Sequence, residues 1–411
     1  MGPGPGQGVI RGAYDGRARP TLAGSCRNHD SPTMKRCPLL PAAVLLSAVT
    51  ASAHAQEAVG PTVEYIAHAA VIVESASGTR VLIDPYNGDM WMGYRFPEGL
   101  AVDAVLSTHP HYDHDASWYL DASTPVFQHP GSYRVGDIGL EGIEAEHAGA
   151  ARFLAQGAEP YNTIWVLEVD GVRFAHLGDN RSPSAEDIRG IGGADVWFVT
   201  PFTPAAEVRA VARDAGVRIV VPVHYRLPEL AAPNYRLATA EDWLADERDV
   251  VLEPGHRVSY APSTLPSNVE FHVLRAHPGV RAWPPELLEA WALESRARER
   301  TQAADAEGAA ALLRQAVELS PTVINFHLAL AQSLVEANRS AEARDVLARG
   351  LAQAPRSDFE RTLRTHGLLG RLLAEAGLDE RAEVHYRFVV GHRRTYAADV
   401  LAEASAFLEG R

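Results

Sequence analysis

The chain has 411 residues and carries 38 Lys and Arg against 52 Asp and Glu, which gives a formal net charge of −14 at pH 7. Its length suggests two or three domains, and a hydrophobic content of 46% is ordinary for a globular protein. The acidic balance argues against nucleic acid or an anionic membrane surface as the binding partner.

The first 55 residues predict an export signal. Residues 1–33 are rich in Gly, Pro and Arg without periodicity, and we interpret them as a non-native leader ahead of a true start at Met34. Over 34–55, two basic residues precede a short apolar run, and small residues end at Ala55. The run is too short to span a bilayer, so we expect a signal peptide cleaved after Ala55, no transmembrane anchor, and a periplasmic or secreted protein. A disordered Ala-rich tail is the alternative.

Cleavage at this point would change the charge and the available metal ligands. The removed segment holds six Lys and Arg and two Asp and Glu, so the formal net charge falls from −14 to −18. It also holds both cysteines, Cys26 and Cys37. A mature chain without cysteine has no disulfide and no thiolate ligand, so any metal site would use His and carboxylate side chains.

Short apolar runs bounded by turn residues predict β-strands after Gln56. Asp170-Gly171 is a typical turn of a hairpin, and the last two strands enclose a predicted helix over 204–215. Hairpins mixed with βαβ units predict sheets covered by helices. The predicted strands are 62–66, 70–73, 80–83, 104–107, 163–169, 172–175, 195–199 and 217–221.

The composition changes after residue 261. Residues 262–289 are Pro-rich and predict an irregular linker, whereas 290–411 is rich in Ala, Leu, Glu and Arg with helical periodicity. A 34-residue period is visible, since the pattern of 316–321 recurs at 350–355. This resembles the tetratricopeptide repeat, in about three copies and a closing helix near 397–408. A generic helical bundle is the alternative.

The segment His109-Pro-His-Tyr-Asp-His114 contains three imidazoles and a carboxylate within six residues. Residues two apart in an extended segment point the same way, so His109 and His111 can hold one ion. Asp113 and His114 follow at a turn and can face a second ion. The apolar strand that leads into this segment makes a His-rich surface loop the less favoured interpretation.

Three further candidate ligands follow predicted strands or loops. His147 lies in the segment Glu144-Ala-Glu-His-Ala-Gly149, Asp179 follows an apolar strand and a glycine, and His224 ends a buried strand. Each of them alone is weak evidence, because a single His at a strand end is more often structural. Their order after the six-residue motif strengthens the prediction that all three are metal ligands.

The motif Thr108-His-Pro-His-Tyr-Asp-His114 resembles that of the metallo-β-lactamase superfamily, and the resemblance extends over about 60–260. It implies an α/β fold: a four-layer αβ/βα sandwich over 56–261, followed here by the all-α repeats. It also implies a set of ligands. His109, His111 and His147 would hold one metal, Asp113, His114 and His224 the second, and Asp179 would bridge them.

Two further segments resemble the branch that contains ascorbate-6-phosphate lactonase and N-acyl-phosphatidylethanolamine phospholipase D. They are Ile66–Val71 and Leu82–Pro85, although Ala67 stands where that branch usually has Gly. Within them, His68 and Asp84 are candidates for pocket groups or for groups that orient the ligands. The aromatic loop 86–96 either roofs the site or packs on the sheet.

The resemblance implies a dinuclear metal-dependent hydrolase, which the predicted signal peptide would export. A metal-bound hydroxide would attack an ester, lactone, amide or phosphodiester bond of a small-molecule substrate, and Asp113 would both bind metal and orient the hydroxide. Two Zn²⁺ are expected, although Mn²⁺ or Fe²⁺ would fit similar ligands. The alternatives are a non-catalytic periplasmic scaffold that binds a protein or peptide partner through its helical repeats, and a single-iron oxygenase.

Overall fold

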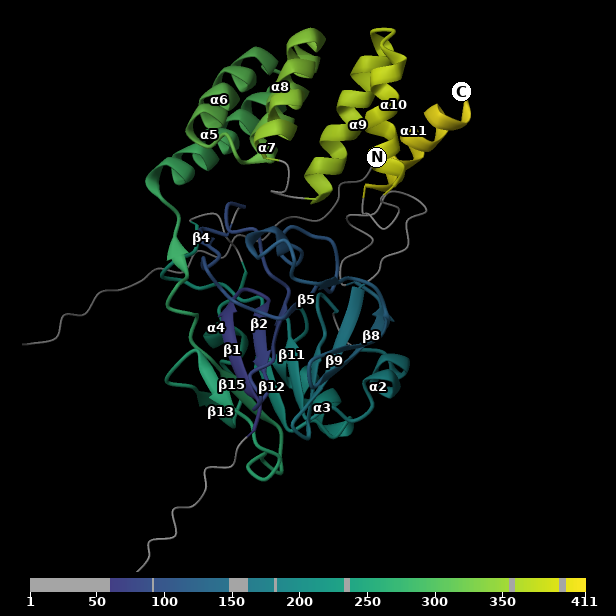
Figure 1. The fold of residues 1–411 in the computed structure, drawn as a ribbon. Helices are drawn as coiled ribbons and strands as arrows, with labels where there is room; N and C mark the ends of the chain where they lie inside the picture. Colours follow the sequence, from purple (N-terminus) through teal and green to yellow (C-terminus); the bar gives the residue numbers. More distant parts are fainter. Residues whose placement is uncertain are drawn as a thin grey trace, which may run out of the picture. The chain divides into compact units, whose positions relative to one another are not determined.

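The computed structural model describes residues 60–90, 92–147, 162–180, 183–232, 237–354, 359–391 and 397–411. The predicted leader and signal peptide lie outside these residues. Within them, a strand-rich region precedes an all-helical region (Figure 1).

The strand-rich region contains a six-stranded sheet. Neighbouring strands are antiparallel from β14 to β3 and parallel from β3 to β6. In order across the sheet they are β14 (Arg257–Ser259), β1 (Thr62–Ala67), β2 (Ala70–Glu74), β3 (Arg80–Ile83), β5 (Ala104–Leu106) and β6 (Val126–Phe127).

A second sheet has eight strands. Neighbouring strands are parallel from β13 to β10 and antiparallel from β10 to β7. In order they are β13 (Val250–Leu252), β15 (Glu270–Val273), β12 (Ile219–Pro222), β11 (Val196–Val199), β10 (Val172–His176), β9 (Asn162–Val169), β8 (Ile138–Ala145) and β7 (Gly131–Val135).

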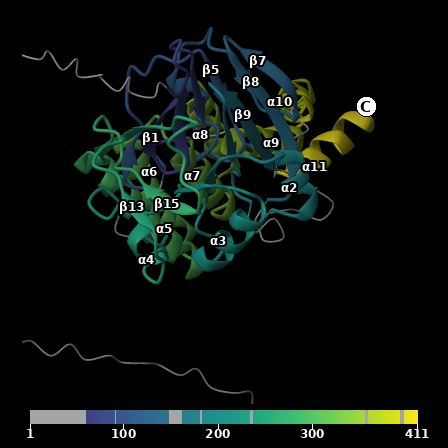
Figure 2. The ribbon, with the colours of Figure 1, turned by 90° about the horizontal axis from the view of Figure 1, so that it is seen from below.

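The eight-stranded sheet is covered on both faces. Along β9, Trp165 and Leu167 belong to the core shared with the six-stranded sheet, whereas Ile164 and Val166 face the helices. This alternation is the two-residue period of a strand. The helices on the outer face are α2 (Ala185–Ile191), α3 (Ala205–Asp214) and α4 (Ala240–Trp243), and all three are labelled in the view from below in Figure 2. Between β5 and β6 the chain forms only the short 3₁₀ turn η1 (Ser117–Tyr119).

The expectation of an irregular linker over 262–289 is wrong. Within this range β15 lies between β13 and β12, and Phe271 is fully buried against the helices. Next, β16 (Arg281–Ala282) pairs with β4 (Tyr94–Arg95), and α5 begins at Pro285. A four-residue strand that includes Glu and His carries too little hydrophobic pattern to stand out in the sequence.

The helical region has three antiparallel helix pairs and a closing helix, as the 34-residue period predicts. Small residues let the helices approach closely: a Cβ on Gly370 would lie 3.1 Å from the Tyr386 ring. None of the described helices is both long and apolar enough to cross a bilayer. The helices are α5 (Pro285–Gln302), α6 (Ala306–Leu319), α7 (Ile324–Glu336), α8 (Ser340–Gln353), α9 (Phe359–Glu375), α10 (Asp379–Val390) and α11 (Ala398–Glu409).

Candidate metal centre

All seven candidate ligands follow strand ends, and these ends meet at one place. The buried strand β5 leads into the loop 107–116, which carries four of the ligands. His147 follows β8, Asp179 follows β10, and His224 follows β12. Parallel strands of one sheet end at the same edge, so β10 and β12 bring their polar residues together although these are far apart in sequence.

The first cluster contains His109, His111, His147 and Asp179. One ligand atom from each of these residues lies within 4.8 Å of the others. His109 Nε2 is 3.0 Å from His111 Nδ1, and His147 Nε2 is 3.6 Å from Asp179 Oδ2. Three imidazoles and a carboxylate at this separation form a donor set that suits zinc and similar divalent ions.

The second cluster contains His68, Asp113, His114 and His224, again with their ligand atoms within 4.8 Å. Asp113 Oδ2 is 3.1 Å from His68 Nε2, 3.4 Å from His224 Nε2 and 3.8 Å from His114 Nε2. Sequence reasoning placed His68 beside the site. In the structure it belongs to the cluster and contacts a candidate ligand directly; the sequence signal for it was the resemblance of the segment Ile66–Val71.

Asp179 lies between the two clusters. Its Oδ2 faces His147 Nε2 and His109 Nε2 at 3.6 and 3.9 Å. Its Oδ1 faces His114 Nε2 and His224 Nε2 at 3.3 and 3.7 Å. One carboxylate therefore offers one oxygen to each cluster, which is the arrangement expected of a bridging ligand.

Buried polar atoms test whether the site fits a cation. His114 Nε2, His224 Nε2 and Asp179 Oδ1 are buried and make no hydrogen bond. Such groups are costly unless a partner satisfies them. They converge on one another, so a cation at this point would satisfy all three. The residues present fit a metal.

Asp84 orients a ligand of each cluster. His114 Nδ1–H donates to Asp84 Oδ2 at 2.7 Å, which leaves Nε2 to face the centre. The Thr108 hydroxyl donates to the same oxygen at 2.8 Å and lies 3.0 Å from His109 Nδ1. Because this hydroxyl uses its hydrogen on Asp84, it accepts from His109 Nδ1–H, and His109 Nε2 also faces the centre. The hydroxyl of Thr108 was not foreseen from the sequence.

The backbone at the site adopts unusual conformations. His68, Asp84 and His224 have φ of 54°, 52° and 60°, which is uncommon for residues other than glycine. The His224 N–H donates to the His68 carbonyl at 2.6 Å, so two of these residues hold each other. Strained residues of this kind cluster at functional sites, where the surrounding structure maintains them.

The charges at the centre are strongly coupled. Burial disfavours ionisation of Asp113 and Asp179, but the nearby histidines, His114 above all, outweigh it and hold both pKa values well below the usual range. Burial also lowers the pKa of His114, but Asp179, Asp84 and Asp113 raise it to about 10. Burial and the neighbouring His224 lower the pKa of His68 to about 3. The carboxylates are thus ionised and available to a cation.

Neighbouring histidines have other roles. His176 Nε2–H donates to the Ala69 carbonyl at 2.9 Å, and its Nδ1 accepts from Gly178 N–H at 3.1 Å. Both ring nitrogens are therefore used by the backbone, and His176 is a neighbour of the site at the end of β10 and not a candidate ligand. The loop 86–96 buries Tyr86 and Tyr94 in the core, which favours packing over an open roof.

A third group, Glu64, His256 and His277, also has ligand-like spacing. Gly279 N–H donates to His277 Nδ1 at 2.9 Å, so in the neutral ring the hydrogen is on Nε2, 3.4 Å from Glu64 Oε1. The other oxygen of Glu64 receives Arg80 at 3.1 Å. This group is a charge-balanced network and a poor cation site.

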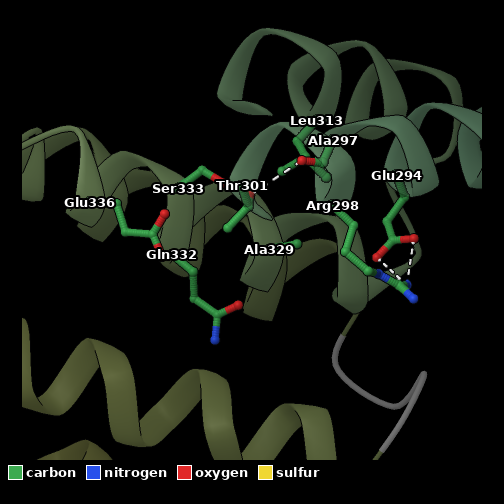
Figure 3. Close-up of a pocket in the computed structure, with 9 residues that line it drawn as sticks. All are labelled: Glu294, Ala297, Arg298, Thr301, Leu313, Ala329, Gln332, Ser333 and Glu336. Carbon is green, nitrogen blue, oxygen red and sulfur yellow. Dashed lines mark hydrogen bonds and ion pairs between the residues drawn. The ribbon is translucent and has the colours of Figure 1, made fainter. Parts of the chain in front are cut away.

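The helical region has its own pocket of about 410 Å³. Figure 3 shows Glu294 and Arg298 of α5 joined by an ion pair, with Gln332 and Glu336 on α7. The lining residues are Glu294, Ala297, Arg298, Thr301, Leu313, Ala329, Gln332, Ser333 and Glu336.

Comparisons with known proteins agree with this geometry. A family described as the beta-lactamase superfamily domain matches residues 62–224, and a tetratricopeptide repeat family matches 300–365. The chain therefore carries a metallo-β-lactamase superfamily domain followed by tetratricopeptide repeats, and its class is that of the metal-dependent hydrolases of this superfamily.

The individual proteins that this chain resembles share less than a third of its residues over the matched regions. A UPF0173 metal-dependent hydrolase of Rubrobacter xylanophilus is 29% identical over 214 residues, which cover 41% of this chain and 84% of that protein. A Thermotoga maritima structure described as a Zn-dependent hydrolase of the metallo-β-lactamase superfamily is 21% identical with a TM-score of 0.41, and covers 53% of this chain and all 100% of its own. The Yersinia enterocolitica chaperone SycD, in complex with a YopD peptide, is 16% identical with a TM-score of 0.27, over 29% of this chain and 89% of its own.

Proposed function

We propose that this protein is an exported dinuclear metal-dependent hydrolase that cleaves an ester, lactone, amide or phosphodiester bond in a small-molecule substrate. The observation that carries the proposal is the position of Asp179, whose two oxygens face separate clusters of histidines. A mononuclear site would need no carboxylate between two sets of ligands. The complete second cluster speaks against a single-iron oxygenase and against a scaffold that has lost its metals.

Two divalent ions bound in such a centre would make water nucleophilic near neutral pH and polarise the scissile carbonyl or phosphoryl group. His109, His111 and His147 would hold one ion, Asp113, His114 and His224 the other, and Asp179 both. Zinc is the default for imidazole and carboxylate ligands, and Mn²⁺ or Fe²⁺ would also suit them.

Asp113 is the residue we propose to act on the attacking water. It stays ionised, so it can accept a hydrogen bond from that water at a carboxylate oxygen and orient it. His68 lies 3.1 Å from Oδ2 and fixes the orientation of this carboxylate. Phe202 lies edge-on to His224, with ring centroids 5.3 Å apart, and would shield that side of the centre from solvent.

Metal content and turnover test the proposal together. Residues 56–411 are purified, their metal is quantified by mass spectrometry, and ester, lactone, phosphodiester and β-lactam substrates are assayed. We expect about two ions per chain, and loss of metal and turnover in His111→Ala. His129→Ala removes an exposed histidine outside both clusters and serves as the matched control. No bound metal and no metal-stimulated turnover would refute the proposal.

We also propose export, on the basis of the signal-like pattern over 34–55. The mature protein would begin at Gln56. N-terminal peptide sequencing of protein recovered from the periplasm or medium tests this, and an uncleaved cytoplasmic protein would refute it.

The repeats would bind a protein or peptide partner at the pocket between α5 and α7. Its lining combines the Glu294–Arg298 ion pair with the amide of Gln332, and these groups can hydrogen-bond a peptide backbone. Gln332→Ala should weaken capture from a peptide library, whereas Gln315→Ala on α6, outside the pocket, should not.

A further inference from the structure

The loop between β3 and β4 supports the metal-binding loop. Asn87 N–H donates to the Tyr112 carbonyl at 2.7 Å, and Ala116 N–H donates to the Pro85 carbonyl at 2.8 Å. Tyr112 stands between His111 and Asp113, which belong to different clusters. Any shift of the loop 84–90 therefore moves the backbone that carries a candidate ligand of each cluster.

The same loop is held from its other side by two tryptophans near the start of the helical region. Trp283 Nε1–H donates to the Gly88 carbonyl at 2.5 Å, and Trp291 Nε1–H donates to the Asp89 carbonyl at 2.9 Å. The two indole rings are stacked with centroids 5.9 Å apart. Trp283 is buried and Trp291 is half-buried, so solvent is a poor substitute for these donors.

Apolar packing joins the same elements. Met90 is buried in one cluster with Leu287 and Ala290 of α5, and Tyr112 of the metal-binding loop packs against that cluster. The backbone adds Trp283 N–H, which donates to the Gly93 carbonyl at 2.8 Å. These contacts form a continuous path from α5 through the loop 87–90 to the backbone between the ligands.

We infer that Trp283 and Trp291 are positioning residues for the metal-binding loop, so that the first repeat helix is part of the catalytic scaffold. The inference rests on the proposed dinuclear centre. Neither indole contacts a candidate ligand in the described structure; they act by fixing the carbonyls of Gly88 and Asp89. A site whose supporting residues are loosened binds its metals less well, even when every ligand is present.

Trp291→Phe tests the inference in the full-length protein, because it removes the N–H donor and keeps a smaller aromatic ring in the same position. Tyr386→Phe is the matched control: it removes a hydroxyl that donates to Glu403 at 2.8 Å between α10 and α11, elsewhere in the helical region. Trp283→Phe is the second variant. Circular dichroism checks that each variant is folded.

The first readout is amide hydrogen exchange of the metal-stripped protein. We expect peptides over 84–90 and 107–116 to exchange at least about threefold faster in Trp291→Phe, and to be unchanged in Tyr386→Phe. The second readout is Co²⁺ titration followed by its absorption spectrum, where Trp291→Phe should bind roughly tenfold more weakly.

The outcomes separate the two proposals. If the wild-type protein binds two ions and Trp291→Phe matches it in exchange and affinity, the positioning role is refuted and the proposed function stands. If the wild-type protein binds no metal, the proposed function fails, and the exchange of residues 107–116 still decides whether the tryptophans hold that loop. Equal effects in Trp291→Phe and Tyr386→Phe would indicate general loosening of the repeats and refute the inference.

Discussion

Replacing Asp84 by Asn would test how the outer residues of the centre control the metals. Asp84 Oδ1 accepts Thr108 N–H, and its Oδ2 accepts both the Thr108 hydroxyl and His114 Nδ1–H, each bond between 2.7 and 2.8 Å. Asn has the same shape and tolerates the positive φ of 52° at this position. Its amide NH₂, however, cannot accept a hydrogen bond. In place of Oδ2 it would be a third donor, facing the Thr108 hydroxyl and His114 Nδ1–H.

The expected magnitude follows from the tautomers. To accept from the new amide at Nδ1, neutral His114 would have to carry its hydrogen on Nε2, where it would point at the metal. The Thr108 hydroxyl would likewise accept from the amide and donate to His109 Nδ1, so that His109 would also carry its hydrogen on Nε2. Loss of a residue that orients a metal ligand typically costs about 10- to 100-fold in affinity, or about 1.4–2.7 kcal/mol. Because Asp84 serves one ligand of each cluster, we expect both ions to bind more weakly.

Competition with a chelating indicator measures the affinity for Zn²⁺ in the wild-type protein and in Asp84→Asn. Asp137→Asn is the matched control, since Asp137 also accepts two hydroxyl hydrogen bonds, from Ser75 and Ser77 at 3.0 and 2.9 Å, at an exposed turn. Circular dichroism verifies that both variants fold. Wild-type affinity in Asp84→Asn would refute the reasoning that the tautomers are set by this carboxylate.

Three further outcomes are expected. Asp179→Asn removes the charge shared by the clusters and should lower metal content from two ions to about one per chain, which mass spectrometry checks; full loading would contradict the bridging role. Metal binding at pH 8 should release about one proton, because the pKa of His114 is raised to about 10 while that of His68 is lowered to about 3, so affinity falls as pH falls. Calorimetry in two buffers of different ionisation enthalpy measures the release, and none would speak against it. Gly350→Ala should lower the melting temperature, because its Cβ would lie 2.7 Å from His327 Cβ. That overpacking costs about 1–3 kcal/mol against a helix-propensity gain of about 1 kcal/mol, and an unchanged melting temperature would contradict the clash.

The sequence by itself determined the local elements and the chemistry of the site. Short apolar runs on either side of the Asp170-Gly171 turn predicted β9 and β10 to within about one residue, because such runs and turns are local features that need no distant information. The 34-residue period likewise predicted paired helices, since each pair repeats the same packing. The motif 109–114 predicted a metal centre because its ligands are neighbours in the chain.

Tertiary structure alone decided which distant residues meet. His68 and Asp84 follow β1 and β3 of one sheet, and Asp179 follows β10 of the other. They reach the centre because these strands of both sheets end beside it, and both His68 and Asp84 have positive φ there. The four residues of β15 carry too little hydrophobic pattern to stand out, so this strand was taken for linker, and only its pairing with β12 and β13 places it in the sheet. The hold of Trp291 on Asp89 joins residues 202 positions apart, and only packing of the folded chain creates such a contact.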